Sequence, residues 1–555
     1  MDPIARWLLS AATAGLVAAR FRRRPLAAPE RPPSRGEGSW EEDDVRWTAS
    51  RLKSVLLRQL GGDQVVVVAN REPYIHERRG RGTDILHPAS GLVTALEPVL
   101  EACSGTWIAH GSGSADRENS DASGRLMVPP GASRYRLRRV WLTPEEEKGY
   151  YYGAANEALW PLCHLAHARP IFRRSDWEHY RTVNARFADA VVEEAGRPDP
   201  VVLVQDYHFA LLPRLLRKRL PRATILTFWH IPWPNAERFG ICPWAAEIVE
   251  GMLGSAIVGF HTQLHCNNFL DSADRALELR VDRERHTIVL GNRETAVRPY
   301  PISIEWPSRW LASAPPVPEC RATVRGALGL RPDTLVGLGV DRLDYTKGIE
   351  ERLLAVDRLL ERFPSLRGRF VFIQLAAPSR TRIERYAQLA DDVAKLTERI
   401  NDRWGKGRYK PVVLAAEHQD PSTVFRYFRA ADACYVSSLH DGMNLVAKEF
   451  VAARDDLQGA LVLSRFTGAA RELTAGLIVN PYDLEEASGA LAIAVEMDEA
   501  EQRARMQALR AIVAENNVFR WAGRMLADGA RARLSDRLTS EVYSRTALPG
   551  QESMP

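Results

Sequence analysis

Short runs of apolar residues recur along the chain from residue 64 to residue 480. Within each run the apolar residues are consecutive rather than alternating with polar ones, which is typical of parallel strands covered on both faces. This pattern predicts buried strands at residues 64–70, 200–206, 224–230, 256–261, 335–340, 370–375, 411–415, 434–438, 460–464 and 477–480.

Amphipathic stretches of helical length lie between these runs, for example at residues 177–195, 349–362, 382–400 and 421–430. Strands that alternate with helices along most of a chain favour an α/β, doubly wound architecture. Three prolines, at positions 315, 316 and 318, interrupt the alternation and indicate a boundary between two halves. We expect two Rossmann-like domains, with ligands bound in the cleft between them, beyond the carboxyl ends of the strands.

The predicted organisation has four parts. Residues 1–62 are expected to be a flexible, basic N-terminal extension, with the folded region starting near Gln64. Residues 63–305 form the first Rossmann-like domain and residues 306–535 the second, and residues 536–555 form a loose tail.

The composition is that of a globular protein, with 45% hydrophobic and 26% charged residues, so a disordered chain or a membrane bundle is a poor interpretation. The net charge of +5 has one source. Residues 1–35 hold seven arginines against Asp2 and Glu30, and the rest of the chain is neutral. The folded part therefore shows no sign of a nucleic-acid partner.

Six cysteines lie far apart, without a C-x-x-C pair, which argues against a disulfide framework or a structural zinc site. A reducing, cytoplasmic location is expected. Residues 7–19 are apolar and a basic stretch, 20–24, follows them, but the run is too short to span a bilayer. Residues 4–24 either make a weak contact with an anionic membrane surface or form a disordered or weakly helical extension.

The first stretch of candidate chemistry is the loop after the strand predicted at 335–340, which reads G-V-D-R-L-D-Y-T-K-G. It places Arg342 and Lys347 five residues apart, between a buried strand and a helix, where two cations can clamp a diphosphate. The alternative is a solvated loop in which the arginine pairs with an aspartate of the same loop.

The second stretch, residues 437–450, reads S-S-L-H-D-G-M-N-L-V-A-K-E-F. Asp441 and Gly442 follow a strand, and a helix is expected to begin at residues 443–445, so free backbone N–H groups there suit a phosphate. Glu449 lies further along this helix, where its carboxylate can accept hydrogen bonds from ribose hydroxyls. The alternative is a helix-capping Asp441 with Glu449 on the surface.

Two more polar residues, Asp206 and His230, lie at the carboxyl ends of predicted strands. Asp206 can bind sugar hydroxyls or take a proton, although it can equally cap a helix. His230 is either a structural histidine or part of a rigid, aromatic-walled sugar pocket made with Trp229, Pro232, Trp233 and Pro234.

Several motifs are missing, namely the Walker G-x-x-x-x-G-K-[ST], H-E-x-x-H, G-x-S-x-G and any D-x-D. Without a D-x-D there is no obvious carboxylate pair for a metal–diphosphate complex, and no motif indicates a cofactor. Arg342 and Lys347 would then stabilise a leaving diphosphate themselves.

Taken together, these stretches resemble the trehalose-6-phosphate synthase family of retaining glycosyltransferases. The resemblance runs from about Val65 to about Trp521 and includes YYYGAANEALWPLCH, QDYHFALLP, FWHIPWP, GVDRLDYTKG and LHDGMNLVAKEF. It implies a GT-B fold, with two Rossmann-like doubly wound domains facing across a cleft. It also implies a nucleotide-glucose donor and no required metal.

The resemblance implies a role for each matching residue. Around the donor, it places Arg342 and Lys347 on the diphosphate, Asp441 on the glucose hydroxyls, Glu449 on the ribose and His230 beside the glucose 6-hydroxyl. Gly91 and the backbone of four further residues complete the donor site: Gly442, Met443, Asn444 and Leu445. Around the acceptor, it places Asp206 near the reacting hydroxyl and four residues on glucose 6-phosphate: Arg71, Tyr151, Trp160 and Arg380. Catalysis is assigned to Asp206, His230, Arg342 and Lys347.

The sequence departs from the family pattern at several places. The usual S-N-R-L-P reads A-N-R-E-P at residues 69–73, the glycine pair reads Ser90-Gly91, and G-W-S-G reads H-G-S-G at residues 110–113. The usual F-H-Y-R reads C-H-L-A at residues 163–166, and L-R-D-G reads L-H-D-G at residues 439–442. The Arg-Glu-Pro-Tyr at residues 71–74 is similar to glucosylglycerol-phosphate synthases, which use glycerol 3-phosphate.

The resemblance thus implies glucosyl transfer from UDP-glucose to glucose 6-phosphate, giving trehalose 6-phosphate and UDP. One alternative is the same donor chemistry on glycerol 3-phosphate or another phosphorylated acceptor. A non-catalytic sugar-phosphate sensor is a further alternative. The nucleotide base and the formation of a homo-oligomer stay open.

Overall fold

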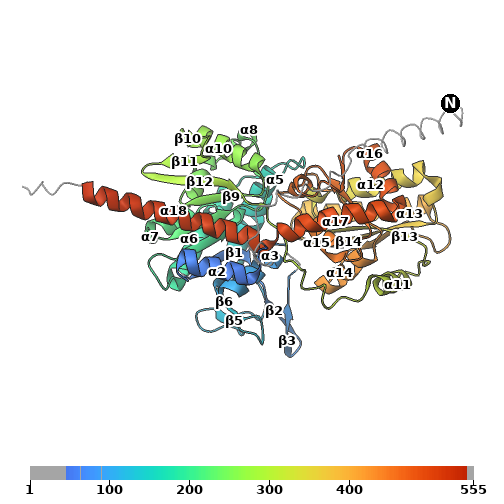
Figure 1. The fold of residues 1–555 in the computed structure, drawn as a ribbon, viewed down its shortest axis with the longest axis horizontal. Coiled ribbons are helices and arrows are strands. Elements are labelled where there is room, and N and C mark those ends of the chain that lie inside the picture. The colour runs from blue at the N-terminus through green and yellow to red at the C-terminus, as the bar shows by residue number, and fades with distance from the viewer. Residues whose placement is uncertain (1–45, 63, 89–90, 547–555) are drawn as a thin grey trace, which may run out of the picture.

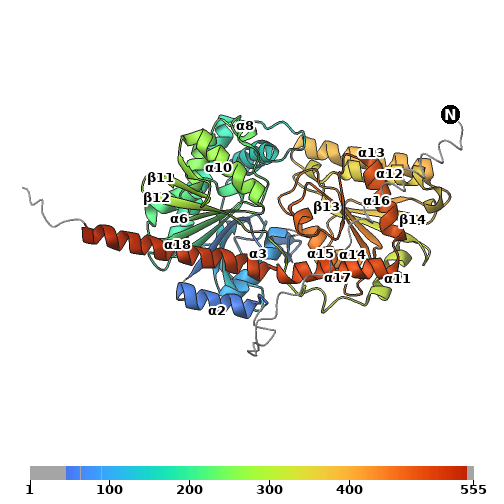
Figure 2. The same ribbon diagram turned by 45° about the horizontal axis from the view of Figure 1, so that its top comes forward.

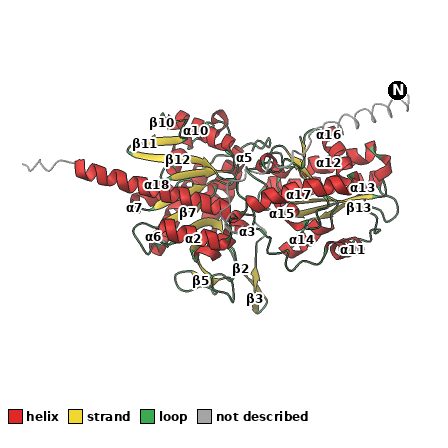
Figure 3. Cartoon of the chain, in the orientation of Figure 1, coloured by secondary structure: helices red, strands yellow, loops and turns green. Residues whose placement is uncertain are grey.

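The computed structural model describes residues 46–62, 64–88 and 91–546, with side chains up to residue 535. Two parallel sheets, each enclosed by helices, form two lobes that lie side by side (Figures 1 and 3). This arrangement confirms the predicted α/β fold class. The proposed membrane contact of residues 4–24 and Ser90 of the glycine pair lie outside the described residues. Within the described part, no helix is long and apolar enough to cross a membrane.

The first sheet has ten strands in the order β10-β11-β12-β9-β8-β7-β1-β4-β6-β5. Its centre is parallel, and β5, β10 and β11 pair antiparallel with their neighbours. The strands are β1 (Val65–Arg71), β4 (Thr106–His110), β5 (Arg125–Val128), β6 (Tyr135–Val140), β7 (Val201–Gln205), β8 (Thr224–Phe228), β9 (Ile257–Phe260), β10 (Arg280–Asp282), β11 (Thr287–Leu290) and β12 (Arg293–Pro299). A hairpin of β2 (Ile75–Arg79) and β3 (Gly82–Leu86) stands outside this sheet.

The helices that accompany the first sheet include one unusual segment, a π-helix at Lys148–Leu159 that leads into α5. They are α2 (Ala49–Leu60), α3 (Gly91–Cys103), α4 (Pro144–Glu147), α5 (Trp160–Cys163), α6 (Arg174–Glu194), α7 (Leu212–Arg219), α8 (Ala236–Phe239), α9 (Ala245–Met252) and α10 (Gln263–Leu277).

The second sheet has six strands, all parallel, in the order β15-β14-β13-β16-β17-β18. Its strands are β13 (Leu335–Arg342), β14 (Phe370–Ala377), β15 (Val412–Ala415), β16 (Ala433–Val436), β17 (Ala460–Ser464) and β18 (Leu477–Val479). The helices are α11 (Val317–Ala327), α12 (Ile349–Arg362), α13 (Glu384–Trp404), α14 (Pro421–Ala430), α15 (Leu445–Ala453), α16 (Leu484–Glu496) and α17 (Glu499–Glu515). All ten predicted strands are present, four in the first sheet and six in the second, with ends shifted by two residues or fewer.

The folded region begins earlier than predicted, because α2 precedes Gln64 and packs on α3. Its side chains Leu52, Leu56 and Leu60, spaced four residues apart, lie on one face and are buried. The prediction that all of residues 1–62 form a flexible extension is therefore wrong for residues 49–60.

The last helix, α18 (Val518–Thr546), returns to the first lobe, and Figure 2 shows it continuing the line of α17 across both lobes. Tyr300 donates a hydrogen bond to Asp528 Oδ2 at 2.6 Å, and Arg533 donates to the carbonyl of Asp199 at 3.0 Å. The predicted second domain (306–535) thus ends in a helix that packs on the first lobe, and the predicted tail (536–555) begins inside that helix.

Gly523 tests the packing of α18 on the N-terminal segment. A methyl group at this position would overlap the indole ring of Trp47. We expect Gly523→Ala to lower the free energy of unfolding by about 1–3 kcal/mol through overpacking. Gly326→Ala, in α11 with nothing within 4 Å, is the matched control and should stabilise by about 0.5–1 kcal/mol. Urea unfolding measures both, and a neutral Gly523→Ala would mean that Trp47 does not pack here.

Candidate functional site

A cavity of about 400 Å³ lies between the lobes, at the carboxyl ends of strands from both sheets. Asp206 follows β7, Arg342 ends β13, and Asp441 lies beyond β16. The lining includes nearly the whole predicted site: Arg71, Gly91, Tyr151, Trp160, Asp206, His230, Arg342, Lys347, Arg380, Asp441, Met443, Asn444, Leu445 and Glu449. Gly442 lies just behind it, where a β-carbon would overlap the carbonyl oxygen of His230, so a glycine lets the two lobes approach.

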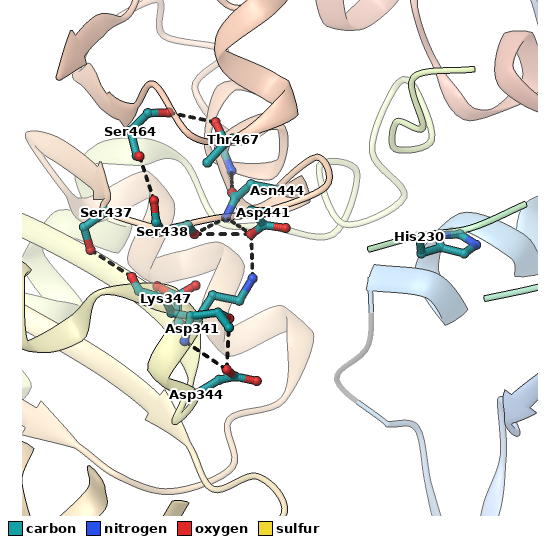
Figure 4. Close-up of polar contacts among 12 residues, drawn as sticks. His230, Asp341, Asp344, Lys347, Ser437, Ser438, Asp441, Asn444, Ser464 and Thr467 are labelled. Carbon is teal, nitrogen blue, oxygen red and sulfur yellow. Dashed lines mark hydrogen bonds and ion pairs between the residues drawn. The ribbon is translucent and has the colours of Figure 1, made fainter. Parts of the chain in front are cut away.

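Lys347 and Asp441 form an ion pair on the second-lobe side of the cavity, with Nζ 2.5 Å from Oδ2 (Figure 4). The same carboxylate oxygen accepts hydrogen bonds from Ser438 Oγ at 3.2 Å and Asn444 Nδ2 at 3.3 Å. Burial raises the pKa of Asp441, but the charge and hydrogen bond of Lys347 and the hydrogen bond from Asn444 together outweigh burial, and the net pKa lies well below its ordinary value. Asp441 is therefore an ionised acceptor suited to sugar hydroxyls.

The guanidinium of Arg342 is available to a ligand, because no described residue forms a side-chain hydrogen bond or ion pair with it. The two aspartates of its loop have other partners. Asp341 pairs with Arg352 at 2.6 Å, and Asp344 pairs with Arg380 at 2.8 Å. The alternative of an arginine paired inside its own loop is therefore wrong.

Buried hydrogen bonds hold the backbone around Lys347 in place. Ser437 Oγ lies 3.0 Å from the carbonyl of Lys347 and 2.6 Å from that of Gly348, which adopts a left-handed φ of 61° just before α12. A left-handed residue at this point lets the chain turn sharply from the strand into the helix. The turn directs Lys347 toward Asp441 (Figure 4).

Helix α15 begins as predicted, and its N-cap residue is Asn444, whose Oδ1 accepts from the N–H of Ala447 at 3.0 Å. Asp441 is thus free of the capping role considered from sequence. Further along, Glu449 lines the cavity, and burial alone raises its pKa to about 7. A half-buried carboxyl in this position suits ribose hydroxyls.

Asp206 and His230 lie together on the first lobe. Asp206 Oδ1 accepts hydrogen bonds from the N–H groups of Tyr207 at 2.9 Å and His230 at 3.1 Å, so it caps a short helix as well as lining the cavity. Burial raises the pKa of Asp206 to about 7, although these bonds oppose the shift. Burial also lowers the pKa of His230 well below its ordinary value, so its ring, 2.8 Å from Gln205 Oε1, is neutral.

The part of the cavity around Tyr151 and Trp160 carries concentrated positive charge. The Arg380 guanidinium lies 4.0 Å from the centre of the Trp160 ring and donates to Tyr386 OH at 2.6 Å. Burial raises the pKa of Tyr151, but the charges of Arg380, Arg71 and Arg342 outweigh it and leave the pKa below its ordinary value. Three guanidinium groups around one tyrosine suit a phosphorylated ligand.

Other cavity residues were missed from sequence. Gln205 stands next to Asp206, and its place before the D-Y-H motif could have indicated it. Asp344, which holds Arg380 but does not itself line the cavity, lies in the loop already chosen for Arg342. Arg309 and Trp310 come from the segment that joins the lobes, and no spacing pattern marks them.

The residues near Arg71 that differ from the family pattern lie away from the cavity. Glu72 Oε2 accepts from Arg139 Nε at 2.7 Å, and Tyr74 OH bonds to Glu97. Neither Glu72, Tyr74 nor His110 is part of the cavity lining. Among the residues that the structure covers, no cluster of three or more histidine, cysteine, aspartate or glutamate side chains could hold a metal ion.

Two parallel-sheet lobes with a cationic cavity between their strand ends define a glycosyltransferase of the GT-B type. The sequence profile of glycosyltransferase family 20 matches residues 63–531. This chain belongs to glycosyltransferase family 20, the trehalose-6-phosphate synthase family.

Relatives match over most of their length. The trehalose-6-phosphate synthase of Mycolicibacterium vanbaalenii is 39% identical over 475 residues, which cover 83% of this chain and 95% of that protein. An Escherichia coli structure described as bound with UDP-2-fluoro glucose is 31% identical, covers 84% of this chain and 99% of its own, and has a TM-score of 0.74. A Burkholderia xenovorans synthase in complex with glucose-6-phosphate is 30% identical, with coverage of 84% and 100% and a TM-score of 0.74.

Removing the unpaired cation should impair the chemical step. We expect Arg342→Ala to lower kcat by about 100- to 1000-fold, because developing charge on the leaving diphosphate loses a preorganised partner. Arg382→Ala, an exposed arginine outside the cavity lining, is the matched control and should change kcat less than twofold. Release of nucleoside diphosphate at saturating substrate measures both, and a near-normal rate for Arg342→Ala would contradict this assignment.

Glu449 should make the stability of the folded protein depend on pH. Its pKa in the folded protein, about 7, lies above the ordinary value of 4.5. Its contribution to folding stability is therefore fully present below pH 4.5 and is lost as the pH rises through 7. We expect the thermal midpoint to fall less in Glu449→Gln than in the unmodified protein between about pH 5.5 and about pH 8. Identical falls in the two proteins would mean that Glu449 ionises normally.

Proposed function

We propose that the chain transfers glucose from UDP-glucose to glucose 6-phosphate with retention of configuration, releasing UDP and α,α-trehalose 6-phosphate. The observation that carries this function is one cavity that holds an unpaired Arg342 at a strand end and two further arginines, Arg71 and Arg380, whose charges act on Tyr151. These features provide a diphosphate site and a second anion site within reach of each other. Family membership and relatives of about 40% identity support the same reaction.

The proposed reaction takes place on one face of the donor sugar. The anomeric hydroxyl of glucose 6-phosphate attacks C1, the bond from C1 to the β-phosphate oxygen breaks, and that oxygen takes the hydroxyl proton. Arg342 and Lys347 stabilise the charge that develops on the diphosphate, and Asp441 and the neutral ring of His230 hold the glucose hydroxyls. A preorganised, partly dry site makes these interactions stronger than in water.

The acceptor site is proposed to use Arg71, Tyr151, Trp160 and Arg380, with Asp206 beside the reacting hydroxyl. Asp206 has a pKa of about 7, so near neutral pH it can accept a hydrogen bond from that hydroxyl. Both substrates are phosphorylated and do not cross membranes, which agrees with the cytoplasmic location proposed from the cysteine content. Assembly into a homo-oligomer and a membrane contact of residues 4–24 remain proposals from the sequence.

Glycerol 3-phosphate is the second candidate acceptor, because of the Arg-Glu-Pro-Tyr stretch and His110. The cavity lining does not include Glu72, Tyr74 or His110, so these residues would not contact an acceptor bound in the cavity. A non-catalytic sensor is disfavoured by the complete set of cavity residues, above all the unpaired Arg342.

The deciding experiment measures UDP release from UDP-glucose with glucose 6-phosphate and, in parallel, with glycerol 3-phosphate. We expect release only with glucose 6-phosphate, because similar proteins are trehalose-6-phosphate synthases and one of their structures is described in complex with glucose-6-phosphate. We also expect Tyr74→Phe to leave this preference unchanged, since its hydroxyl bonds Glu97. Release only with glycerol 3-phosphate would overturn the acceptor assignment, and release with neither would overturn the function.

A further inference from the structure

Two of the sequence departures meet across the lobes. Leu165 follows α5 on the first lobe, and His440 follows β16 on the second, directly before Asp441. The backbone N–H of Leu165 donates a hydrogen bond to His440 Nδ1 at 3.0 Å. The family pattern has Tyr-Arg at 165–166 and Arg at 440, and an arginine side chain carries only donors. Histidine at 440 therefore allows a contact with this amide that the usual residue cannot make.

The direction of this bond fixes the protonation state of His440. A backbone amide only donates, so Nδ1 must keep its lone pair and the proton lies on Nε2. Burial lowers the pKa of His440 to about 4, with Asp441 opposing the shift and Arg238 adding to it. The ring is therefore neutral near pH 7. Two further neutral histidines, His164 and His265, face it edge-on, with ring centres 6.2 and 6.3 Å away.

His440 also lies between the two binding regions of the cavity. On the acceptor side, His164 Nδ1 donates to the carbonyl of Trp160 at 2.9 Å, and the two rings lie 4.2 Å apart. Trp160 in turn stacks on Arg380. On the donor side, His440 is bonded through the chain to Asp441, the partner of Lys347. A continuous series of contacts thus joins the acceptor wall to the donor loop.

We propose that His440 is a positioning residue whose Nδ1 latches the Asp441 loop to the segment around Leu165, so that the donor and acceptor sites are assembled in one closed arrangement. This inference rests on the proposed function, since it concerns the same site. The latch depends on a nitrogen that accepts a hydrogen bond, and not on the positive charge of the arginine that the family pattern has at position 440.

Two substitutions distinguish the contribution of the hydrogen-bond-accepting nitrogen of His440 from the contribution of its ring. His440→Asn keeps an oxygen close to the position of Nδ1 and removes the ring, whereas His440→Phe keeps a ring and removes the acceptor. With UDP-glucose and glucose 6-phosphate, we expect His440→Phe to lower kcat/KM by about 3- to 10-fold, the equivalent of one net hydrogen bond. His440→Asn should stay within about twofold of the unmodified protein.

Hydrogen exchange at the amide of Leu165, measured by mass spectrometry with UDP and glucose 6-phosphate present, gives a readout independent of turnover. We expect protection in the unmodified protein and in His440→Asn, and faster exchange in His440→Phe. The latch is wrong if His440→Phe matches the unmodified protein in rate and exchange, or if His440→Asn is impaired as strongly as His440→Phe. An unmodified protein that releases no UDP would instead refute the proposed function, while the exchange comparison would still decide the latch.

Discussion

A cleft that binds two phosphorylated molecules must hold several cations close together before either ligand arrives, and this constraint shapes the site. Arg71, Arg342, Arg380 and Lys347 line one cavity, where their mutual repulsion has to be offset without neutralising all of them. Two carboxylates divide the task. Asp344 bonds Arg380 and Asp441 bonds Lys347, while Arg342 has no such partner among the described residues. The resting site thus keeps a net attraction for phosphate.

These charges come from separate lobes, so the chemistry also depends on how the lobes are held. Lys448 Nζ, on α15, donates to the carbonyl of Ile302 at 2.8 Å and to Glu472 at 2.7 Å, which ties α15 to the end of the first lobe. Helices α17 and α18 run in sequence across both lobes (Figure 2). The effective concentration of one bound substrate at the other depends steeply on their relative geometry. Contacts that hold the lobes together therefore matter for the rate as much as the residues that touch a ligand.

Much of this could be predicted from the sequence, and the failures have physical reasons. Parallel strands buried on both faces leave continuous apolar runs, so the second sheet was found in full. Strands near the edges of the first sheet, such as Tyr135–Val140 and Arg293–Pro299, carry many charged residues and give no such run. The packing partners of α2 and α18 were missed, because an amphipathic pattern shows that one face of a helix is buried but does not show which element covers that face. The ion pair between Asp344 and Arg380 joins two loops 36 residues apart, which no local pattern reveals.

The departures from the family pattern show why a sequence difference beside a binding residue is not yet a difference in the pocket. Glu72 follows Arg71 directly, but it lies in a buried network with Asp116 and Arg139. One arginine cannot balance two buried carboxylates, so burial and the neighbouring Asp116 raise the pKa of Glu72 to about 8, and it keeps its proton near neutral pH. Glu72 therefore supports the backbone that presents Arg71 without adding charge to the acceptor site. The contacts of a changed residue, more than its distance along the chain from the site, decide what the change does.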